Sequence, residues 1–375
     1  MECQTVSHMG SRRALRQWCS LELMLLEENK PLASFTTFGI GGPARWFVEA
    51  ASEEEIAEAA VWTGERNVAL FVLGGGSNLL VSDAGFDGLV LRVRLQGIAA
   101  MYVAGDPRYK IYQAAAGEDW EHCVQQTIQD GCAGLECLAG IPGTVGGTPV
   151  QNVGAYGQEV ASVIEQVRAF DLREHRFVEF TAAECGFAYR RSRFNSEDRG
   201  RYIVTRVDYR LKPGGAPTLR YAELQRAFPE DVQPSLAQVA AHVRRIRQAK
   251  GMLLVEGDPD CRSAGSFFKN PVVSEEQFRQ IAAASNNAPP RFPADLKTEN
   301  QGMVKVPAAW LIEQAGFRKG YARGNAFISS RHTLALVNRG GASAAEILAL
   351  ASQIIAAVEE RFGIRLEMEP VLVGF

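Results

Sequence analysis

One short stretch of the chain combines residue types that can carry out chemistry on a charged substrate. It reads RSAGSFFKNP at 262–271, where Ser266 precedes two phenylalanines, Lys269 and Asn270. The stretch lacks the G-x-S-x-G pattern of a nucleophile elbow and contains no histidine, which disfavours an acyl-enzyme serine. Two interpretations stay open. Ser266 is either a proton donor on a fixed loop or part of a surface turn with an aromatic anchor.

A second stretch, CGFAYRRSRFN at 185–195, places arginines between aromatic residues. Solvated surface cations are the simpler interpretation. Arginines that alternate with phenylalanine and tyrosine are more often partly desolvated, and a desolvated guanidinium binds carboxylate or phosphate well. Near the C-terminus, Glu367 and Glu369 lie two residues apart, so they share a face if this segment is a strand. Either glutamate is a candidate buried acid.

Two glycine-rich stretches indicate a site for a long ligand. VLGGGSNLLV at 72–81 is followed by an apolar segment and not by a helix, so it is not the G-x-G-x-x-G dinucleotide fingerprint. LAGIPGTVGGTPVQNVGAYG at 138–157 interleaves glycine with apolar residues, which argues against a floppy loop. Such a path can pack against a flat ligand and offer it backbone N–H donors. We expect both stretches, on different predicted domains, to face one ligand with a central pyrophosphate.

Length and composition bound the remaining possibilities. A chain of 375 residues suggests two or three domains. A net charge of −3 gives no general attraction to nucleic acid or anionic membranes, and no apolar run is as long as a membrane span. Seven cysteines without C-x-x-C indicate a reduced cytoplasmic protein. Five histidines without a close pair argue against a metal site.

Helices and strands alternate along most of the chain. Cap residues followed by apolar residues at helical spacing predict helices that begin near Ser52, Gly117, Ser235, Ser274 and Ser343. Strands are predicted at 67–73, 88–93, 202–211 and 332–337, with a hairpin at 164–180. The basic end of one helix, 244–250, is interpreted as a complement to the helix dipole and not as a nucleic-acid site.

These elements predict an α+β protein with several domains. The predicted parts are an N-terminal extension at 1–29, a first domain at 30–95, a second at 96–215, a connecting segment at 216–250 and a third domain at 251–365. The last segment, 366–375, is expected to form a strand that returns to the first domain.

Seven stretches together resemble the family of UDP-N-acetylenolpyruvoylglucosamine reductases, the MurB family. They are TTFGIGGPA (36–44), VLGGGSNLLV (72–81), GLECLAGIPGTVGG (134–147), NVGAYG (152–157), CGFAYRRSRF (185–194), RSAGSFFKNP (262–271) and AAWLIEQAGFRKGY (308–321). They follow the family's order from about residue 30 to the C-terminus. No single stretch is decisive, but the ordered set is highly specific.

The resemblance implies a three-domain FAD-binding flavoprotein of the vanillyl-alcohol-oxidase type with a C-terminal substrate-binding domain. NADPH would reduce non-covalently bound FAD, which would pass hydride to UDP-N-acetylglucosamine enolpyruvate and give UDP-N-acetylmuramate. This product is a cytoplasmic precursor of peptidoglycan, so the resemblance places the chain in cell-wall biogenesis, cell shape and cell division. It implies a monomer whose partners are this substrate and NADPH, with no nucleic acid and no membrane span.

The resemblance also assigns site residues. The catalytic residues would be Ser266, Arg190 and Glu369. Glu367 is the alternative glutamate, because Leu366-Glu-Met-Glu369 departs from the family's usual Leu-Glu-Pro-Glu. The FAD-binding residues would be Gly74, Gly75, Gly76, Ser77, Asn78, Gly140, Ile141, Pro142, Gly143, Thr144, Gly146 and Gly147. The substrate-binding residues would be Tyr221, Lys250, Asn270, Lys319 and Tyr189. No metal is implied.

Two other functions fit parts of this pattern. One is an FAD oxidase or dehydrogenase of the same fold that acts on an alcohol or hydroxy acid. Such enzymes often hold flavin covalently through histidine, and no histidine lies in or beside either glycine-rich stretch. The other is a non-catalytic flavin- or UDP-sugar-binding protein, which would need neither Ser266 nor Arg190.

Overall fold

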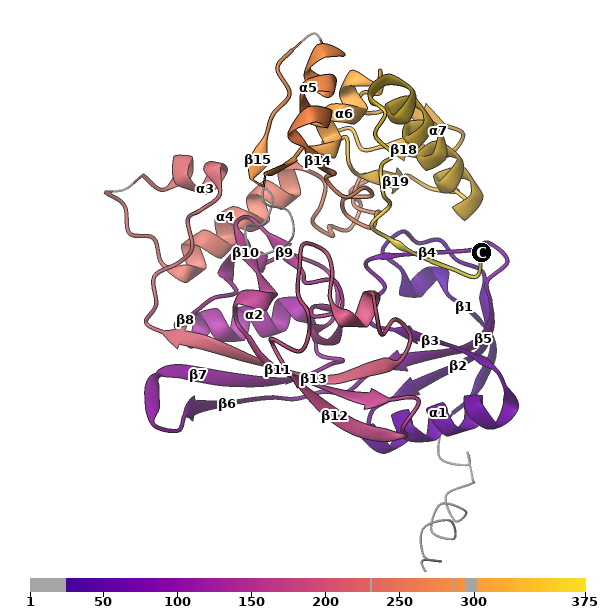
Figure 1. Cartoon of the computed structure of the whole chain (residues 1–375). Helices are drawn as coiled ribbons and strands as arrows, with labels where there is room; N and C mark the ends of the chain where they lie inside the picture. Colours follow the sequence, from indigo (N-terminus) through magenta and orange to yellow (C-terminus); the bar gives the residue numbers. More distant parts are fainter. Residues whose placement is uncertain (1–24, 230, 286, 294–301) are drawn as a thin grey trace, which may run out of the picture.

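The computed structural model describes residues 25–229, 231–285, 287–293 and 302–375. The first two thirds of the chain form the lower half of the molecule, and the C-terminal third lies above it (Figure 1). Most of the predicted extension at 1–29 lies outside the described residues. Among the helices described, none is both long and apolar enough to cross a membrane.

The first part contains a four-stranded sheet with the order β1-β2-β5-β3. Its elements are β1 (Glu27–Pro31), η2 (Ala33–Phe35), β2 (Pro43–Ala50), α1 (Glu53–Arg66), β3 (Ala69–Leu73), β4 (Leu79–Val81) and β5 (Phe86–Val93). The predicted capping box of Ser52 and Glu55 begins α1. β1 starts before residue 30, inside the predicted extension. The sequence analysis missed this strand because its charged sequence shows no strand alternation.

The second part is built on an antiparallel sheet in the order β12-β11-β13-β7-β6. Its elements are β6 (Ile98–Val103), β7 (Asp106–Ala115), α2 (Trp120–Gln129), β8 (Cys132–Ala133), η3 (Glu136–Leu138), η4 (Val145–Gly147), β9 (Gly154–Ala155), β10 (Gln158–Glu159), η5 (Val160–Ser162), β11 (Ile164–Asp171), β12 (Arg176–Thr181), η6 (Arg193–Asn195) and β13 (Tyr202–Pro213). The hairpin predicted at 164–180 is confirmed as β11 and β12.

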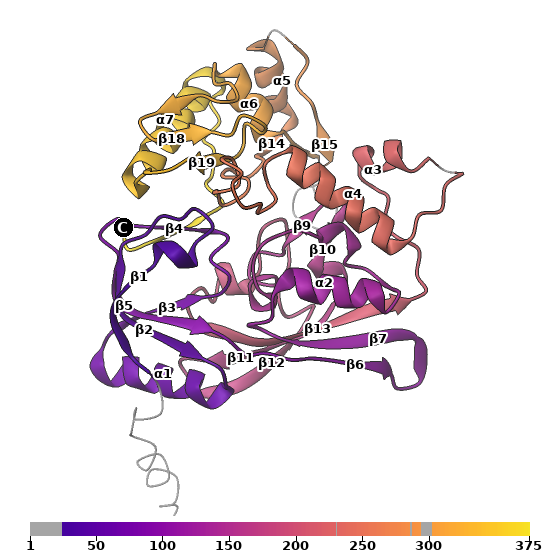
Figure 2. The same ribbon diagram turned by 180° about the vertical axis from the view of Figure 1, so that it is seen from behind.

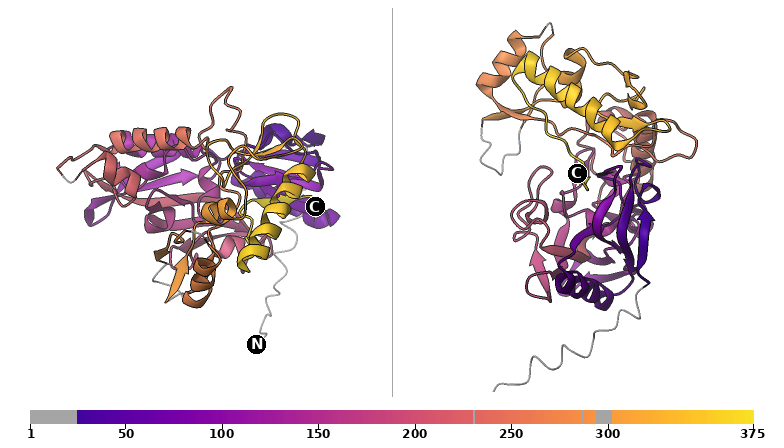
Figure 3. Two further views of the ribbon diagram at one scale, coloured as in Figure 1. Left: turned by 90° about the horizontal axis from the view of Figure 1, so that it is seen from above. Right: turned by 90° about the vertical axis from the view of Figure 1, so that its right-hand side faces the viewer.

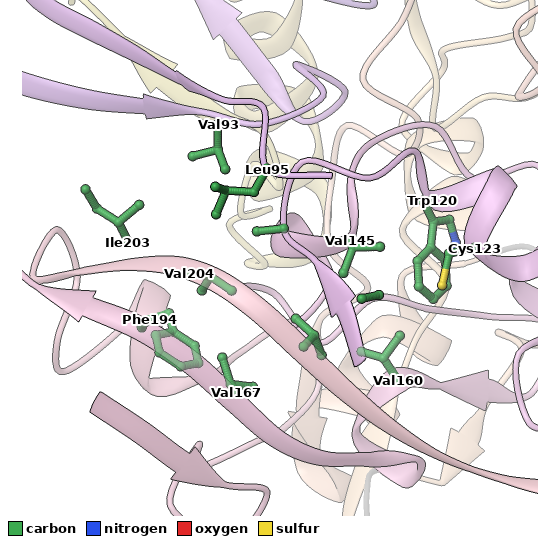
Figure 4. Packing of buried hydrophobic residues seen from close by; sticks show 14 of the residues in the cluster. Val93, Leu95, Trp120, Cys123, Val145, Val160, Val167, Phe194, Ile203 and Val204 are labelled. Atoms are coloured by element: carbon green, nitrogen blue, oxygen red, sulfur yellow. The ribbon is translucent and has the colours of Figure 1, made fainter. Parts of the chain in front are cut away.

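The two lower parts share one apolar core. Val93 and Leu95, at the end of β5, lie above Val204 and Phe194 of the second part, and Val145 lies beside Trp120 (Figure 4). All of these residues belong to a single buried cluster. The glycine-rich stretches therefore leave from parts that are packed together and cannot move independently without opening this core.

The connecting segment and the C-terminal part complete the fold. The elements are α3 (Ala222–Ala227), α4 (Leu236–Ala249), β14 (Val272–Ser274), α5 (Glu275–Ala283), β15 (Phe292–Pro293), β16 (Met303–Lys305), α6 (Ala308–Gln314), β17 (Ala322–Arg323), β18 (Ala326–Ile328), β19 (Leu336–Asn338) and α7 (Ala344–Phe362). The strand predicted at 332–337 is largely wrong. Residues 332–335 form a turn in which Ala335 N donates to His332 O, so β19 begins only at Leu336.

The end of the chain returns to the first part. β20 (Val371–Val373) pairs in parallel with β4. Figures 2 and 3 show the C-terminus beside the indigo first part of the chain. Val371 N donates to Asn78 O at 2.9 Å, within the first glycine-rich stretch. The pairing therefore brings Glu369 close to that stretch.

Candidate active site

A cavity of about 790 Å³ lies where the two lower parts meet the C-terminal part. Residues 74–78 and most of 141–147 line it, together with Ser266, Arg190 and Glu369. Tyr221 and Lys250 also line this cavity. Gly140 lines a second cavity of about 630 Å³, which shares several glycines with the first. The structure thus brings both glycine-rich stretches and all three predicted catalytic residues to one place.

The two glycine-rich stretches touch backbone to backbone. A Cβ on Gly75 would lie 2.5 Å from Gly143 Cα, and one on Gly76 would lie 1.8 Å from Phe35 O. Gly76 also has φ of +64°. Any side chain at these positions would force main chain apart, so glycine is required by space and, at Gly76, by conformation as well.

Gly147 has the opposite surroundings. Apart from its chain neighbours, no described residue has a heavy atom within 4 Å of a Cβ built on it, and the residue is exposed to the cavity. In the described structure, the main-chain N–H groups of Gly75, Gly76 and Ser77 donate to no other backbone or side-chain group. Free N–H donors beside open space fit the phosphates of a dinucleotide cofactor such as FAD.

Ser266 and Glu369 are held on adjacent main chain. Phe268 and Met368 form an antiparallel bridge, in which Glu369 N donates to Phe267 O at 2.9 Å. Phe267 and Phe268 are fully buried in the C-terminal core. The phenylalanines are therefore anchors, as one interpretation of this stretch predicted, and they fix Ser266 at the cavity wall. The role of Ser266 as a proton donor stays a prediction.

Arg190 and Glu369 form a partly buried ion pair. Arg190 Nε lies 2.9 Å from Glu369 Oε1, and Arg190 Nη2 donates to Gly154 O at 3.0 Å. Arg190 is a non-glycine residue with φ of +55°, a conformation that costs free energy and often marks functional sites. Arg191, by contrast, pairs with Glu197 at the surface. Partial desolvation, which the aromatic spacing indicated, holds for Arg190 and not for its neighbour.

Burial and the ion pair have opposite effects on the pKa of Glu369, and the effect of burial is larger. Burial raises the pKa of Glu369, and the nearby charge of Arg190 lowers it only in part. For Arg190 burial alone would lower the pKa, but the Glu369 carboxylate outweighs it and the net shift is upward. The guanidinium therefore stays charged, while the carboxyl is held closer to its protonated form than an ordinary glutamate.

The second glutamate has different surroundings. The Glu367 side chain is 71% exposed and pairs with Lys269, whereas the Glu369 side chain is 12% exposed. Glu367 does not line the cavity. Glu367 and Glu369 therefore differ in environment although they lie two residues apart. Only Glu369 lies beside Arg190 and lines the cavity.

The other end of the cavity is aromatic and basic. Lys250 Nζ lies 2.7 Å from Glu223 Oε2 and 3.5 Å from the Tyr221 hydroxyl. The rings of Tyr156 and Tyr221 meet edge to face, 5.2 Å apart. Burial tends to lower the pKa of Lys250, but the hydrogen bond to Glu223 and nearby charges raise it overall, so the amine stays protonated.

Three predicted substrate-binding residues do not line the cavity. Tyr189 is hydrogen-bonded to Asn270, and Lys305 Nζ lies 4.7 Å from the Tyr189 ring centroid. Asn270 Oδ1 accepts from Ala308 N at 2.9 Å. Lys319 is exposed. In the described structure, the Tyr189 ring lies against Arg190, with the guanidinium carbon 5.3 Å from the ring centroid, and Lys319 faces solvent.

His332 and Arg247 are among the cavity residues that sequence reasoning missed. Burial, reinforced by the charges of Lys250 and Lys319, lowers the pKa of His332 to about 4. Its Nδ1 accepts from Leu334 N at 3.2 Å, so a neutral ring carries its proton on Nε2. No sequence signal marked this histidine.

The contacts of Arg247 show that the basic end of α4, interpreted from the sequence as a complement to the helix dipole, has a further role. Arg247 is 7% exposed, and its Nε donates to Gly140 O at 2.9 Å while Nη2 donates to Met252 O at 2.7 Å. It therefore fastens the second glycine-rich stretch and does more than complement the dipole. The signal was present, since Arg247 follows Val243 by four residues on the buried face of α4.

Comparisons with known proteins show which family the chain resembles. A family model described as "FAD binding domain" matches residues 44–176, and one described as "UDP-N-acetylenolpyruvoylglucosamine reductase, C-terminal domain" matches 258–373. The chain is 44% identical to the UDP-N-acetylenolpyruvoylglucosamine reductase of Streptomyces coelicolor, covering 92% of this chain and 89% of that one. It is 43% identical to the reductase of Thermobifida fusca, covering 92% and 97%.

A solved structure extends the likeness to the fold. The UDP-N-acetylenolpyruvylglucosamine reductase (MurB) from Thermus caldophilus matches with a TM-score of 0.63 and 28% identity, covering 93% of this chain and 99% of that one. The prediction of an α+β FAD-binding flavoprotein with a separate C-terminal domain is confirmed. The chain belongs to the family of UDP-N-acetylenolpyruvoylglucosamine reductases.

Proposed function

We propose that this chain reduces UDP-N-acetylglucosamine enolpyruvate to UDP-N-acetylmuramate, with NADPH as the hydride source and FAD as the carrier. Family membership supports the reaction. The observation that carries the assignment of residues is the partly buried pair of Arg190 and Glu369, 2.9 Å apart, in the same cavity as Ser266. A non-catalytic binding protein would not need this pair.

The glycine end of the cavity is the proposed cofactor site. The free N–H groups of residues 75–77 and the open space at Gly147 suit a pyrophosphate and a flat ring system. When bound, FAD supplies the hydride that the substrate receives. The proposed cofactor-binding residues are those assigned by resemblance, except for the side chain of Asn78, which is engaged by Gln151 and Glu369. Binding is expected to be non-covalent.

The charged end of the cavity is the proposed site of proton chemistry. Hydride addition at C3 of the enolpyruvyl group leaves negative charge on C2 and its carboxylate. Arg190 stabilises this charge, and protonated Glu369 hydrogen-bonds the developing enolate. Ser266 then gives its proton to C2, and the resulting alkoxide is reprotonated from solvent. Serine is a weak acid, so the step depends on the enolate being a strong base.

The aromatic and basic end suits the diphosphate of the substrate. Tyr221 and Lys250 supply a hydroxyl and a cation at the cavity wall. Tyr189, Asn270 and Lys319 remain substrate-binding proposals on the family resemblance alone. The domain boundaries at 95/96, 215/216 and 250/251 are likewise proposals, with the first part extended to include β1.

The proposed setting is the cytoplasmic synthesis of peptidoglycan precursors, and hence cell shape and division, by a monomeric enzyme. The test is a turnover assay with purified protein, NADPH and the enolpyruvyl substrate. We expect a yellow protein whose FAD is released by acid precipitation, and NADPH consumption that depends on the substrate. Mass spectrometry should show a product heavier by two hydrogens. Oxidation of alcohols without this turnover would favour the oxidase alternative, and no turnover would favour a binding protein.

A further inference from the structure

Asn78 lies at the end of the first glycine-rich stretch, but its side chain faces the C-terminal segment. Its Nδ2 donates to Gln151 Oε1 at 2.6 Å and to the main-chain carbonyl of Glu369 at 3.2 Å. A main-chain carbonyl can only accept, so the nitrogen of the amide must face Glu369. Both hydrogens of this nitrogen are used, and neither is left to donate to a cofactor.

The main chain of Glu369 is held on both sides. Its N–H donates to Phe267 O, next to Ser266, at 2.9 Å. Its carbonyl accepts from Asn78, and Val371 N donates back to Asn78 O at 2.9 Å. The ion pair with Arg190 then fixes only the end of the side chain.

We propose that Asn78 is a positioning residue for Glu369, acting through the main chain and not through the cofactor. This inference rests on the proposed function, in which Glu369 hydrogen-bonds the enolate. Without Asn78 the carbonyl of Glu369 loses its donor, and the segment before β20 is free to shift. A displacement of about 1 Å at a reacting group can cost about 10²-fold in rate. The loop that carries the cofactor would thereby also set the geometry of the acid.

The test compares Asn78→Ala and Asn78→Asp, which both remove the donors, with Asn325→Ala. Asn325 is exposed and hydrogen-bonds Gly341 O, outside the cavity. Each enzyme is reduced, mixed rapidly with the enolpyruvyl substrate, and followed across a pH range. We expect reoxidation of both Asn78 variants to slow by about 10²-fold with a shifted pH limb. FAD affinity, measured by fluorescence titration of the apoprotein, and reduction by NADPH should stay within a few-fold.

Two results would overturn the proposal. One is reoxidation of the Asn78 variants at the wild-type rate with the wild-type pH limb. The other is loss of FAD affinity as the main defect, which would make Asn78 a cofactor contact. If Asn78→Ala does not fold, the isosteric Asn78→Asp carries the same test. Failure of the wild-type enzyme to be reoxidised would overturn the proposed function itself, so the two failures are distinguishable.

Discussion

The two ends of the main cavity differ in whether main chain or side chains form them. The glycine end is made of main chain from two neighbouring loops, with Gly75 and Gly143 in direct contact. The charged end is made of side chains from distant segments, with Arg190 facing Glu369. Where two main-chain segments are in contact, an added side-chain atom forces them apart. Where side chains form the site, a substitution can remove a reactive group and leave the fold unchanged. Substitutions should therefore act on folding and cofactor binding at one end and on rate at the other.

A large effect on rate is expected after removal of the cation at the charged end. Arg190→Gln should slow reoxidation of the reduced enzyme by the enolpyruvyl substrate about 10²–10³-fold, the usual loss for one preorganised electrostatic donor. Reduction by NADPH should change little, because no charge develops on the substrate in that step. Stopped-flow measurement of each step separates them. Equal slowing of both steps would show that Arg190 shapes the cofactor site and would erase the contrast between the two ends.

The glycine end should respond through stability. Gly75→Ala places a methyl group 2.5 Å from Gly143 Cα, and such overpacking typically costs about 1–3 kcal/mol. Gly147→Ala is the matched control. It meets no atom within 4 Å, so it should leave the melting temperature unchanged and weaken only FAD binding. Equal melting temperatures for the two variants would contradict the backbone-contact account.

The charged end should also show a pH dependence that the other end lacks. Burial raises the pKa of Glu369, so the carboxyl is protonated below that pKa and the substrate step should slow as pH rises through it. The same shift contributes stability that is present below the unfolded pKa of glutamate and lost as pH rises through the folded pKa. Reoxidation rates across pH should show this limb in the wild type and not in Glu369→Gln. An identical limb in both would assign it to another group.

The smallest effect is expected at the neighbouring glutamate. Glu367 is 71% exposed, and an exposed pair such as Glu367 and Lys269 is worth about 0–1 kcal/mol. Glu367→Gln should leave both half-reactions and the melting temperature close to wild type. A large loss of turnover in this variant would reverse the choice of Glu369 as the acid.

The two ends also differ in how far the sequence predicts them. The glycine-rich stretches, the capped helices and the hairpin at 164–180 follow from local residue types, and the structure confirms them. Arg190, Ser266 and Glu369 meet only through tertiary contacts, and local patterns left each with two interpretations until the family resemblance was applied. His332 could not be found, because its burial depends on a turn where a strand was predicted.

The most direct test of the division between the two ends is Ser266→Ala, studied one half-reaction at a time. Ser266 lines the cavity, and removal of its hydroxyl should not disturb the buried Phe267 and Phe268 anchors, as melting curves can check. Reduction by NADPH should proceed nearly as in the wild type. Reoxidation by the enolpyruvyl substrate should slow about 10²–10⁴-fold, the usual contribution of a positioned general acid. Reoxidation within a few-fold of the wild type would contradict the account.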